Sequence, residues 1–229
     1  LHPTSMPSRY GIGDLGDFSF TWIDMLSQMK QSFWQLCPLG PTGFGDSPYQ
    51  CFSSFAGNPL LISPDSLEAE GLLTRTELEN YPRLPDSAVD FAAVIVQKEK
   101  IFRKAYSRFT DTDEFIQFCE NERYWLDDYA LFRAIKDLMG GKPWYLWDAP
   151  LKMRDPAAIK EISAAERNMI RYQKFLQFCF YRQWTTLKSY ANKNGVRIIG
   201  DIPYYTAYDS SDVWAAMELF ELDESGKPL

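Results

Sequence analysis

Apolar residues recur at helical spacing through most of the chain. After Gly16 they follow one another at steps of three and four residues, and Asp14 or Asp17 can cap the start of this first helix; its apolar positions are Phe18, Trp22, Met25, Leu26 and Met29. From Leu60 to about Pro156 the pattern is again helical, and it predicts helices over Ser66–Glu70, Thr76–Asn80, Asp90–Phe109, Asp111–Asn121 and Tyr124–Met139. A long helix is then predicted from about Ala164 to Lys193, closed by Asn194-Gly195 in the left-handed conformation.

Two short apolar runs interrupt the helical pattern and predict buried strands. The first covers Phe33–Leu39 and the second covers Val196–Ile202. Because strands covered by helices on both faces belong to parallel sheets, the order helix, strand, helical insertion, helix, strand favours a parallel α/β architecture. This is either a (β/α) barrel or an open doubly wound sheet. Leu1–Thr4 is a candidate for the tail of a still earlier strand. Two or three strands cannot close a barrel, which needs about eight.

A long loop, Gly40–Asn58, follows the first strand. It is rich in Gly, Ser and Pro, yet it carries the rings Phe44, Tyr49, Phe52 and Phe55. Asp201 ends the second strand, and in a parallel sheet both features lie at the carboxyl edge, where (β/α) barrels place their chemistry. Rings beside polar side chains suit a neutral polyhydroxylated ligand, because the rings stack on sugar C–H faces and the polar groups bind hydroxyls. The alternatives are that the rings pack the core and that Asp201 caps the next turn.

The composition narrows the classes of protein and partner. The 229 residues suffice for one large domain or two small ones, and 45% hydrophobic with 24% charged residues is typical of soluble globular proteins. The sequence has no apolar run long enough to span a bilayer, no secretion signal and no initiator Met, so we expect no membrane partner and a longer parent protein. The net charge of −7 disfavours nucleic acid as a partner. Four cysteines without a C-x-x-C pair indicate reduced thiols in a cytosolic protein, and the single histidine, His2, removes most zinc sites and most histidine-based catalysis.

Two short motifs match known site patterns but lack the context that their chemistry needs. Gly11–Gly16 has the G-x-G-x-x-G dinucleotide-binding pattern, but Pro and Ser residues precede it where a buried strand is required. Gly16 also falls before the helix rather than inside its first turn. Gly45-Asp46-Ser47 can be read as the nucleophile block of a serine esterase, but His2 is the only histidine that could act as the base. The sequence therefore favours neither site.

Several segments, in order along the chain, resemble the 4-α-glucanotransferases of glycoside hydrolase family 77, the amylomaltases or disproportionating enzymes. They are Leu1–Ser5, Gly11–Gly16, Pro38–Gly43, Gly45–Gln50, Phe55–Pro59, Gly200–Tyr204 and Asp209–Trp214. The resemblance implies an α/β fold, a (β/α)8 TIM barrel of the α-amylase clan with inserted helical subdomains. Only about the first three barrel strands would be present in this chain.

The same resemblance implies a division of the chain into three parts. Residues 1–59 would form the first part of the barrel, 60–163 a mainly helical inserted subdomain, and 164–229 a barrel helix, strand three and the following loop. Strand one would end at Leu1–Thr4, strand two would be Phe33–Leu39, and strand three would be Val196–Asp201.

The activity implied by the resemblance is transfer of a 4-α-glucanosyl segment from one α-1,4-glucan to the 4-hydroxyl of an acceptor glucan or glucose, with retention of configuration. Retention needs two carboxyl groups about 5–5.5 Å apart. The family's nucleophile Asp, acid/base Glu and transition-state-stabilising Asp belong to strands four, five and seven. The resemblance therefore places all three beyond Leu229 and leaves no catalytic residue in this chain, which by itself should be inactive. The implied substrates are maltooligosaccharides, amylose and glycogen branches, with no metal, nucleotide or other cofactor and a cytoplasmic location.

Four residues match substrate contacts of the family. Tyr49 resembles the ring that stacks on the sugar at the cleavage subsite, and Asp46 and Ser47 in the same loop would shape it or bind hydroxyls. Asp201 resembles the strand-three Asp that orients the cleavage-subsite sugar. Phe44 stands where some members have Tyr in a secondary glucan contact, so a hydroxyl-dependent contact is not implied there. Two alternatives remain open: a non-catalytic glucan-binding fragment, and a hydrolytic α-glucosidase or amylase relative.

Overall fold

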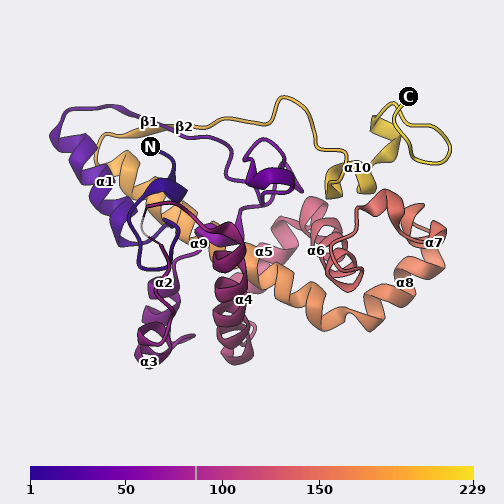
Figure 1. Ribbon diagram of the computed structural model, residues 1–229, viewed down its shortest axis with the longest axis horizontal. Coiled ribbons are helices and arrows are strands. Elements are labelled where there is room, and N and C mark those ends of the chain that lie inside the picture. Colours follow the sequence, from indigo (N-terminus) through magenta and orange to yellow (C-terminus); the bar gives the residue numbers. More distant parts are fainter. Residues whose placement is uncertain (86) are drawn as a thin grey trace. The chain divides into compact units, whose positions relative to one another are not determined.

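The computed structural model describes residues 1–85 and 87–229 and is mostly helical, with one small parallel sheet (Figure 1). The chain forms two compact units, each assembled from three separate segments. Unit 1 comprises Leu1–Leu39, Gly57–Thr112 and Leu176–Ile202, and unit 2 comprises Gly40–Ala56, Asp113–Phe175 and Pro203–Leu229. The three-part division of the barrel predicted above concerns a larger fold and stays a prediction.

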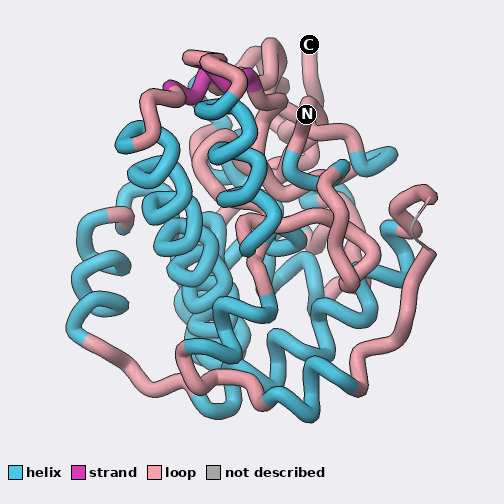
Figure 2. Tube along the Cα trace, turned by 90° about the vertical axis from the view of Figure 1, so that its left-hand side faces the viewer, coloured by secondary structure: helices cyan, strands magenta, loops and turns pink. Residues whose placement is uncertain are grey.

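The sheet consists of β1 (Phe33–Gln35) and β2 (Arg197–Ile199), paired in parallel with Trp34 opposite Ile198. Figure 2 shows how little of the described chain these strands occupy beside the helices. Both strands are shorter than the predicted runs Phe33–Leu39 and Val196–Ile202, because an apolar run marks burial whereas a strand extends only as far as its hydrogen-bonding neighbour does.

Burial on both faces of these strands was also predicted, and this is wrong for the described chain. Trp34 is buried, but Phe33 and Ile199 are almost half exposed. Successive side chains of a strand point to opposite faces, so one face of this pair is covered and the other is open. Leu1–Thr4 was expected to end a strand. It instead leads into a short 3₁₀ helix, η1 (Pro3–Ser5), in which Pro3 has no N–H to give to a strand partner.

Unit 1 contains α1 (Asp17–Gln28), α2 (Pro64–Ala69), α3 (Arg75–Glu79), α4 (Phe91–Arg108), η3 (Pro59–Leu61) and the carboxyl-terminal part of α9 (Arg167–Lys193). The connection from β1 to β2 returns through α9, as a parallel pair requires. The end of α9 packs on α1, where the Tyr190 hydroxyl donates to Asp24 at 2.6 Å and the Tyr190 and Phe20 ring centroids lie 5.1 Å apart.

Two buried glutamines of α9 hold the chain that leads into the helical insertion. The Gln177 side chain accepts from Gly57 N at 2.8 Å and donates to Gly57 O at 2.9 Å, and Gln183 makes the same pair of bonds with Ser63. A Cβ added at Gly57 would lie 1.9 Å from the Phe180 ring, so this close approach requires glycine. These contacts fix the backbone of Gly57 and Ser63 within unit 1.

Unit 2 contains α5 (Asp113–Asn121), α6 (Arg123–Leu138), α7 (Ala149–Lys152), α8 (Pro156–Ala165), the start of α9, α10 (Ser211–Ala215), and the 3₁₀ helices η2 (Phe44–Asp46), η4 (Trp144–Leu146) and η5 (Met217–Leu219). Its core is unusually aromatic and consists of Leu131, Phe132, Ile135, Trp144, Trp147, Val213 and Trp214. Four of the seven core residues are aromatic, and they come from α6, from η4 and the residue after it, and from α10.

The predicted helices agree with α1 to α6 and α9, to within three residues at their ends. The N-cap of α1 is a correction: Gly16 occupies it, Asp14 accepts from Gly16 N, and Asp17 is the first helical residue. Asp90 caps α4, and Gly195 has φ +78° after α9, as the left-handed closure predicted. The short helices α7, α8 and α10 were not predicted, although Asp155 followed by Pro156 is a cap signal for α8.

Candidate functional site

The aromatic loop folds as a tight hairpin. Thr42 and Cys51 form an antiparallel bridge, and Gly43 N donates to Gln50 O at 2.6 Å. At the tip, Gly45 and Asp46 have φ of +66° and +53°, a left-handed conformation that glycine adopts freely and Asp tolerates better than most residues. The run Gly-Phe-Gly-Asp-Ser-Pro-Tyr thus turns within a few residues and places Asp46, Ser47 and Tyr49 on one hairpin.

The side chains of this hairpin differ in exposure. Tyr49 is 43% exposed, whereas Asp46 and Ser47 are half-buried, and Ser47 Oγ accepts from Tyr49 N at 3.3 Å. The side chain of Phe44 lies outside the described part of the chain. An exposed ring beside a carboxylate and a hydroxyl is the arrangement expected of a sugar contact.

The two other rings of the loop have different surroundings. Phe52 packs half-buried against the aromatic core, and Arg133 and Lys136 lie over its ring at 5.1 and 5.0 Å from the centroid. Phe52 therefore fits the core-packing alternative. Phe55 is 47% exposed and stacks on Trp125, with ring centroids 6.3 Å apart.

Ser211 and Asp212, the first two residues of α10, form hydrogen bonds with the strand of the hairpin that follows Tyr49. Ser211 N and Oγ both reach Phe52 O, at 2.8 and 3.0 Å, and Ser54 N donates to Asp212 Oδ2 at 2.7 Å. Sequence reasoning used Asp209–Trp214 only as part of a resemblance and missed these contacts. A capping Ser before a short apolar helix, Ser210, was the available local signal, but it does not reveal the distant partner.

An ion pair between the buried Lys136 and the half-buried Asp209 also holds this segment. Lys136 Nζ lies 2.6 Å from Asp209 Oδ2, and Asp209 Oδ1 accepts from Trp144 N at 3.2 Å. Burial lowers the pKa of Lys136, and the neighbouring Asp209 opposes this shift. The pair ties the residues ahead of α10 to α6 and η4.

Asp201 follows β2 and is exposed, with Oδ1 accepting from Ile202 N at 2.9 Å. This bond is local and does not cap a helix. The next residues are also exposed, with Ile202 at 79%, Tyr204 at 88% and Tyr205 at 78%. Asp201 belongs to unit 1 and the hairpin to unit 2. That Asp201, Phe44, Tyr49 and Phe52 share one cleft stays a prediction.

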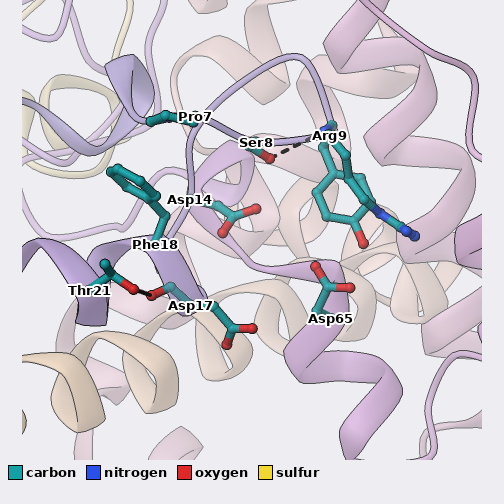
Figure 3. Close-up of a pocket in the computed structure, with 9 residues that line it drawn as sticks. Pro7, Ser8, Arg9, Asp14, Asp17, Phe18, Thr21 and Asp65 are labelled. Atoms are coloured by element: carbon teal, nitrogen blue, oxygen red, sulfur yellow. Dashed lines mark hydrogen bonds between the residues drawn. The ribbon is translucent and has the colours of Figure 1, made fainter.

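The glycine motif Gly11–Gly16 adjoins an acidic pocket of about 320 Å³ in unit 1. Figure 3 shows the carboxylates of Asp14, Asp17 and Asp65 around it, and Arg9 is the one cation among the described residues that line it. A Cβ at Gly13 would lie 2.0 Å from Pro3 O, so this glycine serves close backbone packing. Three carboxylates would repel a pyrophosphate, and the chain before the motif forms η1 rather than a strand. The structure thus speaks against a dinucleotide site.

Asp14 also reaches a fully buried lysine. Lys98 Nζ donates to Leu60 O at 2.7 Å and Ile62 O at 2.8 Å and lies 3.8 Å from Asp14 Oδ2. Burial raises the pKa of Asp14 to about 6 and lowers that of Lys98 to about 8, while the charge of each partner opposes the shift of the other. Lys98 thus fixes the backbone of η3 close to Asp14.

Other candidate chemistry has little support in the described residues. His2 Nδ1 lies 2.8 Å from Thr4 Oγ1 and Ser47 Oγ is bonded within its own hairpin, so each of the two esterase candidates is engaged locally. Among residues 1–85 and 87–229, no three His, Cys, Asp or Glu side chains gather as a metal site would require. In the same ranges, none of the helices combines the length and apolarity needed to cross a bilayer. Cys51 and Cys179 are buried free thiols.

Comparisons with known sequences point to a single family. Residues 1–227 match the profile of glycoside hydrolase family 77, described as 4-alpha-glucanotransferase. The chain is 46% identical to the 4-alpha-glucanotransferase of Synechocystis, over 99% of this chain and 46% of that protein. It is 42% identical to the 4-alpha-glucanotransferase of Thermus thermophilus, over 100% of this chain and 46% of that protein. The chain therefore spans just under half the length of these relatives.

Solved structures agree. An amylomaltase from Streptococcus agalactiae in complex with acarbose superposes with a TM-score of 0.95 at 37% identity, covering 100% of this chain and 47% of that one. An amylomaltase from Corynebacterium glutamicum gives a TM-score of 0.70 at 15% identity over 95% of this chain and 31% of that one, which shows a shared fold.

Proposed function

Because the chain belongs to the 4-alpha-glucanotransferase family, glycoside hydrolase family 77, we propose that the whole protein transfers a segment of an α-1,4-glucan to the 4-hydroxyl of an acceptor glucan or of glucose. The observation that carries this proposal is the hairpin, which presents an exposed Tyr49 beside Asp46 and Ser47. Donors would be maltooligosaccharides, amylose and glycogen branches, and the acarbose bound to the Streptococcus agalactiae relative supports an oligosaccharide ligand.

The architecture proposed for the whole protein is a (β/α)8 barrel of the α-amylase clan. In it β1 and β2 would be strands two and three, and the helical insertion α2 to α8 would project between them. The parallel pairing of β1 with β2 and the crossover through α9 support this assignment. The open face of the strand pair, with Phe33 and Ile199 almost half exposed, is consistent with further strands and core around it.

The proposed mechanism is a retaining double displacement. Two carboxyl groups about 5–5.5 Å apart would act, one attacking the anomeric carbon and one serving as acid and then as base. We place both on later barrel strands, beyond Leu229. The residues of this chain would bind and orient: Tyr49 stacks on the sugar at the cleavage subsite, Asp46 and Ser47 bind hydroxyls, and Asp201 orients the same sugar.

Transfer competes with hydrolysis for the glucosyl-enzyme. An aromatic surface that excludes water favours the acceptor sugar over water, which is the role we assign to the ring of Tyr49. No step of this mechanism needs a metal or an organic cofactor. Buried free thiols at Cys51 and Cys179 support a cytosolic location.

The test is disproportionation of maltotriose by the full-length gene product and, in parallel, by this chain alone. Two maltotriose molecules should give glucose and maltopentaose, followed by longer chains, with the full-length protein, and no products with the chain alone. Glucose and maltose without longer chains would instead indicate a hydrolase. Retardation in an amylose-containing gel without any products would indicate a non-catalytic glucan-binding protein.

A further inference from the structure

We propose that Asp212, together with Ser211, is a positioning residue that fixes the sugar-stacking hairpin, so that removing its carboxylate weakens glucan binding without any contact between Asp212 and the sugar. This inference rests on the proposed function, because it takes Tyr49 as a substrate contact. Asp212 is half-buried, and its carboxylate oxygen accepts from the Ser54 amide at 2.7 Å.

The contact lies on the arm of the hairpin that leads away from Tyr49. Both backbone polar groups of Phe52 are hydrogen-bonded. Its N–H donates to Pro41 O at 3.0 Å, and its carbonyl accepts from Ser211 N and Oγ at 2.8 and 3.0 Å. With Ser54 N also bonded to Asp212, two residues of this arm are tied to α10. Three bonds to one short segment leave the span from Tyr49 to Phe52 little freedom, because the Thr42–Cys51 bridge closes its other side.

Ser211 and Asp212 are themselves held in place by the residues on either side of them. Ser210 caps α10 by accepting from Val213 N at 3.2 Å, and Val213 and Trp214 are buried in the aromatic core. The Lys136–Asp209 ion pair holds the residue just ahead of this cap. The position of the hairpin is therefore set by a packed core rather than by the hairpin's own few contacts.

The chain order gives this arrangement a functional meaning. The gripping residues follow Asp201 on one continuous stretch of chain, Asp201–Asp212. This stretch begins at Asp201, which is one proposed sugar contact. It ends at Asp212, which binds the hairpin that carries the other proposed contacts. A displaced hairpin would lower the affinity for the sugar, because ring stacking needs a defined distance and tilt.

The experiment compares the variants Asp212→Ala and Asp212→Asn in the full-length gene product. Asp212→Ala leaves the Ser54 amide without its charged acceptor and should raise KM for maltotriose about tenfold, with a smaller change in kcat. Asp212→Asn keeps a carbonyl oxygen that can accept the same bond and should stay within about threefold of wild type. This rescue distinguishes positioning from an effect of the negative charge.

The matched control is Asp155→Ala in the same unit, which removes a carboxylate that also accepts backbone N–H groups, those of Ala157 and Ala158 at 3.0 Å, at the start of α8. Its KM should equal that of wild type. Unchanged kinetics in Asp212→Ala, or equal damage in Asp212→Asn and Asp212→Ala, would overturn the proposal.

A second readout does not depend on activity. Amide hydrogen exchange over residues 42–54 should accelerate in Asp212→Ala and not in Asp212→Asn or Asp155→Ala. If wild type fails to disproportionate maltotriose, the proposed function is wrong, and equal exchange in Asp212→Ala and wild type would then reject the positioning role as well. Accelerated exchange in that case would keep the structural half of the inference and reject its link to glucan.

Discussion

At the residue scale, Tyr49 is the side chain on which the proposed glucan contact depends most. It is 43% exposed on the hairpin, so solvent and a ligand can reach a large part of its ring. Tyr49→Ala should lower kcat/KM for maltotriose in the full-length gene product at least about tenfold, because the stacking face is lost, with Tm unchanged. Tyr49→Phe keeps the ring and is the control: it should retain most of the activity. Equal kinetics for Tyr49→Ala and wild type would remove Tyr49 from the site.

Asp201 gives a second prediction at this scale. The residue is exposed, so water solvates its carboxylate in the folded protein much as it does in the unfolded chain. Asp201→Asn should therefore cut kcat while leaving Tm within about 2 °C of wild type, since a group that only orients substrate contributes little to folding. A large drop in Tm with normal residual turnover would favour the structural alternative.

The residues of the hairpin could be predicted from the sequence, but the hydrogen bonds that hold the hairpin to α10 could not. Asp46, Ser47 and Tyr49 are neighbours in the sequence, and their motif was sufficient to single them out. The partners of Ser54 and Phe52 lie more than 150 residues away, at Asp212 and Ser211. A hydrogen bond between segments that are distant in the sequence leaves no periodic pattern, so it is visible only in the three-dimensional structure.

At the element scale, the link between α3 and α4 predicts a pH effect. Glu77 closes the capping box of α3 with Thr74 and binds the Arg108 guanidinium through both carboxylate oxygens at 2.9 Å. Hydrogen bonding from Arg108 lowers the pKa of Glu77 from 4.5 to about 2. Because the folded protein then binds fewer protons than the unfolded chain, this contribution to stability is complete above about pH 4.5 and is lost as pH falls towards 2.

Glu77→Gln should therefore have a lower Tm than wild type at pH 7. This Tm difference should become smaller as the pH approaches 3, and thermal unfolding at several pH values would measure it. The control is Glu79→Gln on the same helix, whose partner Arg75 and own side chain are more than 60% exposed. An exposed pair contributes little, so this variant should follow the wild-type curve. A constant Tm difference for Glu77→Gln across this range would contradict the assigned ionisation.

The helices were more predictable than the strands for a physical reason. An amphipathic period of three to four residues exists only if one face of a helix is buried, so the pattern gives both type and extent, as for α4 and α6. A strand's extent depends on its hydrogen-bonding neighbours, which the run Phe33–Leu39 does not encode. The structure pairs only the first three of these residues in β1.

At the scale of the whole molecule, each of the two units contains one buried lysine among its described residues. In unit 2 Lys136 pairs with Asp209, and in unit 1 Lys98 binds the carbonyls of Leu60 and Ile62 beside Asp14. The sequence predicted helices around these positions, and its length allowed one large domain or two small ones. It did not reveal which residues form each unit, because each unit is built from three segments that are distant in the sequence. Interleaved segments are invisible to a reading along the chain.

If each unit is a cooperative structure of its own, removing its buried lysine should loosen that unit first. Lys136→Met leaves the Asp209 carboxylate, about a quarter exposed, without its partner, and we expect a cost of about 3 kcal/mol, at the low end for breaking a buried pair. Hydrogen exchange should then accelerate in residues 113–175 and 203–229 and remain slow in α4. Lys98→Met is the reciprocal variant and should accelerate exchange in α4 and η3 while α6 stays protected. Acceleration over the whole chain in both variants would mean that the two units unfold as one, with α9, which runs through both, as the element that couples them.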